Sequence, residues 1–178
     1  MATPSLSVSQ KQKEMIMEAP DSHYLRAAEG WLELGNHVEA NEELKQISLQ
    51  SRFHPLALLV RWEIYAMANH WEFAHTIAQG IVAIAPSEPI GWINRSFALH
   101  KLQRTPEAWI KLLPAAKKFP SEPIIAYNLA CYACQIGYTR EAWSWLDKAI
   151  AIGQPEEIKS QALDDPDLQP LWSEIGKL

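Results

Sequence analysis

The sequence predicts an all-α protein in which four helical hairpins stack into a right-handed α-solenoid with a C-terminal capping helix. Two sets of residues recur every 34 positions: Pro55, Pro89 and Pro123, and Ala40, Ala74, Ala108 and Ala142. Apolar residues within each period follow helical spacing. Residues that turn or end a helix also recur at fixed places in the period, so each period is predicted to be one hairpin of two helices.

Composition and charge narrow the class of protein. The chain has 178 residues, of which 48% are hydrophobic and 21% charged, as in an average globular domain. Its two cysteines exclude a disulfide-stapled scaffold, and no apolar run approaches the roughly 18 residues of a membrane span. Residues 1–20 lack the apolar stretch of a secretory signal. A net charge of −5 does not favour nucleic acid, and we expect a cytoplasmic protein.

The period divides the chain into three parts, within one expected domain. Residues 1–20 are an N-terminal segment, expected to be partly mobile, with a short helix at 9–18. Residues 21–156 form the four repeats 21–54, 55–88, 89–122 and 123–156. Residues 157–178 form the capping region, in which Leu168, Leu171, Trp172 and Ile175 recur at helical spacing after Asp164-Asp165-Pro166.

Each repeat is predicted to form two helices, at 21–34 and 37–50, 55–68 and 71–84, 88–102 and 105–118, and 122–136 and 139–151. Apolar residues fill positions 4, 8 and 11 of the first helix and positions 20, 24 and 27 of the second. Position 15, between the helices, carries Gly35, Asn69, Gln103 and Gly137. Pro86 and Pro120 at position 32 end the second and third repeats.

At these positions the chain resembles the tetratricopeptide repeat family. The third repeat fits the family pattern best, with Trp92, Ser96, Leu99, Ala108, Leu112, Ala115 and Pro120. The resemblance covers about three quarters of the chain and implies a protein-interaction scaffold that uses the concave face of its first helices. Arg61 and Arg95 depart from the pattern at position 7, and we expect their charged ends to reach water or carboxylates. Pro114 also departs, inside a predicted helix, which it should bend.

Other candidate chemistry has weaker support in the sequence. Cys131 and Cys134 form a CxxC, but they lie mid-helix without further zinc ligands, so small apolar packing residues are the better interpretation. Asp164, Asp165 and Asp167 fit helix capping better than a calcium loop. The histidines lack metal-binding spacing, and no nucleophile motif or phosphate loop occurs. We therefore expect no enzyme activity, no metal and no cofactor.

The predicted groove collects the residues at positions 2, 5, 6 and 9 of the first helices that could contact a partner. Its nine members are Leu56, Leu59, Ile90, Ile93, Asn94, Phe97, Ile124, Tyr127 and Asn128. The Lys and Asn set of the family's carboxylate clamp is absent from these positions, and Leu25 and Glu29, then Leu59 and Glu63, stand at positions 5 and 9. The predicted partner is a protein or peptide with an apolar segment, held by Asn94 and Asn128 through its backbone.

Alternatives to this groove remain open. The groove could be filled by a second copy of the chain or by its own Met15–Ile16 segment, which would make the protein a structural or regulatory module. A small chaperone of the tetratricopeptide type is a weaker alternative. Charge is uneven along the repeats: 21–54 carries six acidic and three basic residues, and 89–122 two acidic and six basic. Such charges could steer a partner or simply face solvent.

Overall fold

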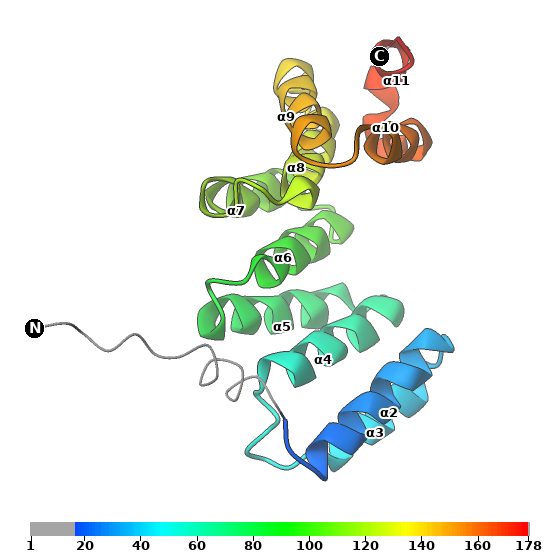
Figure 1. Ribbon diagram of the computed structural model, residues 1–178, viewed down its shortest axis with the longest axis vertical. Coiled ribbons are helices and arrows are strands. Elements are labelled where there is room, and N and C mark those ends of the chain that lie inside the picture. The colour runs from blue at the N-terminus through cyan, green and yellow to red at the C-terminus, as the bar shows by residue number, and fades with distance from the viewer. Residues whose placement is uncertain (1–16, 178) are drawn as a thin grey trace, which may run out of the picture. The chain divides into compact units, whose positions relative to one another are not determined.

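The structure is a computed structural model that describes residues 17–177, and the elements in that range are all helical (Figure 1). The chain divides into two compact units, 1–84 and 85–178. The first unit contains α2 (Asp21–Glu33), α3 (His37–Gln46), α4 (Pro55–Met67) and α5 (Trp71–Ile84). Helix α2 packs on α3 and α4 packs on α5, and α4 also contacts both helices of the first hairpin. The first unit is thus two stacked hairpins.

The second unit also begins with two hairpins. They are α6 (Pro89–Lys101) with α7 (Thr105–Lys118), and α8 (Pro123–Gln135) with α9 (Thr139–Ile152). Helix α8 contacts α6, α7 and α9, so the hairpins stack as in the first unit. The chain continues into α10 (Pro155–Asp164), the 3-10 helix η1 (Pro166–Leu171) and the single turn α11 (Trp172–Ile175). The predicted all-α hairpin architecture is confirmed.

The same turn ends the first helix of every hairpin. At position 15 the backbone φ is positive in all four repeats, at Gly35, Asn69, Gln103 and Gly137. Such left-handed residues allow the Schellman arrangement, in which two N–H groups after the helix bind carbonyls of its last turn. Asn36 N–H donates to Trp31 O at 2.8 Å and Gly35 N–H donates to Leu32 O at 2.9 Å. The other three repeats have the same pair of bonds. Position 15 is therefore the turn that the sequence predicts.

The repeated apolar positions form the core of each unit. The alanines at position 20, which are Ala40, Ala74, Ala108 and Ala142, are all 0% exposed. The residues at position 24, Leu44, Ala78, Leu112 and Leu146, are also buried. A small residue at position 20 lets the two helices of a hairpin approach closely, and the leucine at position 24 in three of the four repeats fills the space between them. Pro55, Pro89 and Pro123 are first-turn residues of α4, α6 and α8, where the missing N–H has no consequence.

The ends of the chain differ from the predictions. A single capping helix was expected in 157–178, but the region contains α10, η1 and α11, and α10 begins before it at Pro155. Helix α3 ends at Gln46 instead of continuing to residue 50, because residues 47–54 form a turn-rich connection to α4. Most of the helix expected at 9–18 lies outside the described residues, and Met17 and Glu18 are not helical. Among residues 17–177, no helix is long and apolar enough to cross a membrane.

Candidate protein-interaction site

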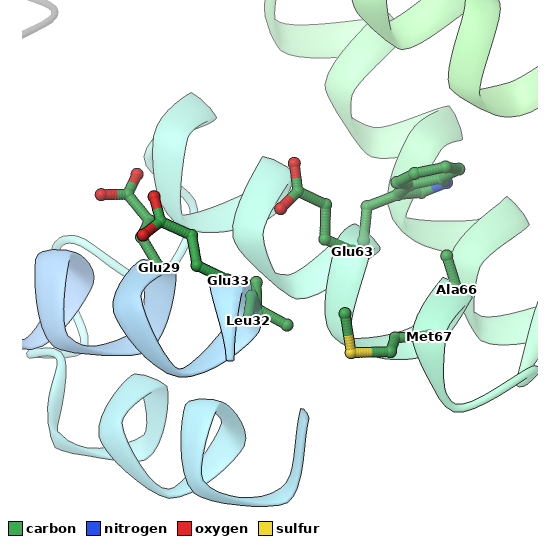
Figure 2. Close-up of a pocket in the computed structure, with 7 residues that line it drawn as sticks. Glu29, Leu32, Glu33, Glu63, Ala66 and Met67 are labelled. Atoms are coloured by element: carbon green, nitrogen blue, oxygen red, sulfur yellow. The ribbon is translucent and has the colours of Figure 1, made fainter. Parts of the chain in front are cut away.

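A pocket of about 650 Å³ opens on the first helices of the first unit. We call it the first-unit pocket. Its lining residues come from the C-terminal halves of α2 and α4: Glu29, Leu32, Glu33, Trp62, Glu63, Ala66 and Met67 (Figure 2). They occupy positions 8, 9, 12 and 13 of repeats 21–54 and 55–88. The pocket therefore lies on the inner helix face that the sequence selects for a partner, but beyond the two residues predicted there.

The first-unit pocket combines an apolar part with three carboxylates. In Figure 2, Leu32 of α2 and Met67 of α4 lie between the two helices, while Glu29 and Glu33 lie together on α2 and Glu63 lies apart from them on α4. Partial burial raises the pKa of Glu63 above its ordinary value, and the charge of Glu29 raises it further. Glu29 and Glu33 are one helical turn apart, a like-charge spacing that disfavours a helix by about 0.2–0.5 kcal/mol. The site therefore holds uncompensated negative charge beside apolar surface.

Three glutamates outside the pocket form ion pairs in the part of the chain that the structure describes, and the pocket carboxylates do not. Glu42 pairs with Lys45, Glu107 with Arg104 and Glu156 with Lys159, each three residues away. Within residues 17–177, no lysine or arginine forms such an ion pair with Glu29, Glu33 or Glu63. A carboxylate next to apolar surface is less well hydrated, so an added cation would be favourable there.

The predicted groove residues of the first unit lie near the start of α4. Leu56 and Leu59 are both half-buried, and Leu56 packs on the core cluster of the first unit. Neither lines the first-unit pocket. The residues that do line it at positions 12 and 13 were missed, although they continue the same helical face as positions 2, 5 and 9. That spacing is the signal that could have identified them.

The seven other predicted groove residues lie in the second unit. Helix α6 carries Ile90, Ile93, Asn94 and Phe97, and helix α8 carries Ile124, Tyr127 and Asn128. These two helices contact one another. Ile90 and Ile124 are 40% and 36% exposed, and Ile93, Phe97 and Asn128 are half-buried. Asn94 and Tyr127 are buried, at 7% and 4% exposed, so this part of the face is closed in the chain itself.

The C-terminal segment covers Tyr127. The Tyr127 hydroxyl donates to Asp165 Oδ2 at 2.9 Å, and Cys131 Sγ lies 3.5 Å from the same oxygen. Asp165 Oδ1 accepts from the backbone N–H of Asp167 and thereby caps η1, which fits the capping role predicted for this acidic cluster. Burial and the neighbouring negative charges raise the pKa of Tyr127 well above its usual range. The hydroxyl therefore stays protonated and donates.

Asp167 extends this contact to α6. His100 Nε2 lies 2.9 Å from Asp167 Oδ2, and Gln135 Nε2 donates to the Asp167 carbonyl at 2.9 Å. Leu168 and Leu171 of η1 are buried in the core cluster of the second unit. A smaller pocket of about 260 Å³ remains beside Ile124 and Tyr127, bounded by the start of α10. The C-terminal segment of the chain itself thus occupies part of the face that was predicted to bind a partner.

The two cysteines and the two arginines at position 7 lie partly or fully buried within the units. Cys131 and Cys134 are free, buried thiols on α8, and burial raises the pKa of both. No group of three or more metal-ligating side chains occurs in the described part of the chain. Arg61 and Arg95 are half-buried, and they donate to the backbone carbonyls of Arg52 and Lys111. Each bond satisfies one nitrogen of the guanidinium group, and Arg95 Nε is buried without a hydrogen-bond partner among the described residues.

Comparisons with known proteins identify the fold. No protein-family model matches the chain. No curated protein matches it either. Among solved structures, MamA 41-end from Desulfovibrio magneticus RS-1 matches with a TM-score of 0.70 and 16% identity over 92% of this chain and 97% of that one. MamA MSR-1 C2 matches with a TM-score of 0.63 and 18% identity over 84% of each chain.

A third solved structure with the same fold has a peptide-binding site. YrrB, described as a TPR protein with an unusual peptide-binding site, matches with a TM-score of 0.62 and 13% identity over 95% of each chain. At these identities the likeness concerns the course of the helices and not the binding residues. The 34-residue period, the Schellman turns and the buried position-20 alanines agree with it. The chain therefore has the fold of the tetratricopeptide-repeat proteins.

Proposed function

We propose that this protein is a protein-interaction scaffold that binds an apolar segment of a partner on the inner face of its first helices. The observation that carries the proposal is the first-unit pocket, an opening of about 650 Å³ with Leu32, Ala66 and Met67 in its lining. Pockets of 300–1,000 Å³ with apolar walls and a few polar groups are typical of binding sites. YrrB, which shares the fold, binds peptide, and this supports the assignment.

The face of the second unit is the second candidate position for the partner. Ile90 and Ile124 are exposed there, with Ile93 and Phe97 half-buried near them on the two first helices. Exposed large apolar side chains on neighbouring helices favour burial by a partner. The C-terminal segment already covers Tyr127, which favours the alternative that this unit is filled by the chain's own terminus. The cytoplasmic location expected from the sequence stays a prediction.

A selection from a random 12-residue peptide display library tests the proposal on the full chain. We expect enriched sequences to contain apolar residues, and Met67→Gln to reduce their capture because it replaces the exposed thioether in the pocket with an amide. Met67→Leu is the matched control, since it keeps the apolar surface. Ile93→Glu with Phe97→Glu tests the second unit in the same way. Enrichment that none of these variants changes, in folded protein, would overturn the proposal.

A further inference from the structure

The two units present the same helical positions with opposite chemical character. In the first unit, positions 9 and 13 hold the pocket carboxylates Glu29, Glu33 and Glu63. In the second unit, the corresponding positions carry Phe97 and Lys101 on α6, and Cys131 and Gln135 on α8. No acidic residue stands at these positions of the second unit. The faces are therefore suited to segments of different charge.

The second unit shows what such a face holds. Its occupant is the acidic segment around Asp165 and Asp167, followed by the buried Leu168. The carboxylates meet hydrogen-bond donors at positions 5, 9 and 12: Tyr127, Cys131 and His100. Position 13 contributes Gln135, which donates to a backbone carbonyl. An extended or 3-10 segment with charged groups ahead of an apolar side chain is thus bound by complementary groups on this face.

The first unit offers the reverse pattern at the same positions. Its carboxylates lie beside apolar surface from Leu32 and Met67, and no lysine or arginine among residues 17–177 forms an ion pair with them. A basic side chain entering the pocket would relieve the repulsion among the three carboxylates while an apolar neighbour covers Met67. An acidic segment of the kind seen in the second unit would add to that repulsion.

We infer that the first-unit pocket binds a protein segment that carries lysine or arginine next to an apolar residue, with Glu29, Glu33 and Glu63 receiving the cationic group. The inference rests on the proposed function and adds the chemistry of the partner. Carboxylates on two different helices can surround one cation from two sides, and this arrangement selects against acidic segments. The volume of about 650 Å³ leaves room for more than one side chain.

The test compares two triple variants of the full chain in the same 12-residue display selection. Glu29→Gln with Glu33→Gln and Glu63→Gln removes the pocket charges but keeps side-chain size. Glu18→Gln with Glu39→Gln and Glu72→Gln removes the same net charge from exposed positions outside the pocket of the same unit. We expect enrichment of lysine and arginine on the wild type and the control variant, and no such enrichment on the pocket variant.

Affinity measurements follow on one enriched peptide, labelled for fluorescence anisotropy. We expect the pocket variant to bind it about tenfold more weakly and the control variant within about twofold, since three partly screened ion pairs contribute modestly. Raising the salt concentration should weaken binding to the wild type far more than to the pocket variant.

The outcomes separate this inference from the proposed function. Enrichment of apolar sequences without basic residues, or of acidic ones, overturns the inference and leaves the scaffold proposal standing. Enrichment that is independent of every pocket and second-unit variant overturns both. Basic sequences that appear only after Lys11→Gln with Lys13→Gln would make the chain's own N-terminal segment the occupant. A dimer that dissociates in the pocket variant would make it a second copy. Either result overturns the inference that a separate protein binds in the pocket.

Discussion

Replacing Asp165 with alanine should destabilise the second unit more than any other single change in the acidic cluster. Its Oδ1 caps η1 through the Asp167 N–H at 3.0 Å, and its Oδ2 accepts the Tyr127 hydroxyl at 2.9 Å. Loss of a cap costs about 0.5–2 kcal/mol. Loss of a hydrogen bond to a charged group costs about 1.5–3 kcal/mol, with a buried hydroxyl left unsatisfied. Because Asp165 is itself half-buried, we expect about 2–4 kcal/mol in total.

The assay is urea unfolding followed by tryptophan fluorescence and circular dichroism. Asp164→Ala is the matched control, because Asp164 is exposed at the end of α10 and its side chain makes no hydrogen bond with the described residues. Its free energy of unfolding should change by less than about 0.5 kcal/mol. A double-mutant cycle of Asp165→Asn with Tyr127→Phe should give a coupling of about 1 kcal/mol or more. Equal effects of the Asp165 and Asp164 variants would refute the reasoning.

Three further outcomes are expected. Glu63→Gln should raise the free energy of unfolding by up to about 0.5 kcal/mol at pH 7 and by less at pH 4, measured in denaturant titrations. The pKa of Glu63 is raised in the folded chain, so its carboxylate costs stability once the pH rises above the ordinary value near 4.5. Equal gains at both pH values would contradict this. Cys131 and Cys134 should resist iodoacetamide in the native chain and react in urea, as counted by mass spectrometry, because burial keeps both thiols protonated. Deleting 164–178 should cause aggregation in size-exclusion chromatography, since it removes the buried Leu168, Leu171 and Ile175; a soluble chain with an unchanged melting temperature would argue against that role.

The repeated elements could be predicted because local sequence determines them. A positive φ at position 15 is tolerated by Gly35, Asn69 and Gly137, and the period predicts the same turn at Gln103, whose residue type alone does not favour it. The alanines at position 20 mark the closest approach of the paired helices, which any large side chain would prevent. Each of these features acts within a hairpin, so the 34-residue period predicts all of them together.

The C-terminal region was predicted less well because its structure depends on distant contacts. Pro155 followed by Glu156 and Glu157 is a good helix start, and this local signal for α10 was missed. The bond between Tyr127 and Asp165 joins residues 38 positions apart, and no local pattern indicates it. Tyr127 was assigned to an open groove for that reason. The backbone acceptors of Arg61 and Arg95 were likewise not predicted, since they are visible only in the folded chain.

The charge pattern also bears on self-association, which the sequence left open. One route would insert the C-terminal segment of one copy into the first-unit pocket of another. That segment would bring Asp164, Asp165 and Asp167 toward Glu29, Glu33 and Glu63, and these like charges repel one another. It would also have to leave the donors that hold it in the second unit, chiefly Tyr127 and His100. Both effects oppose this exchange.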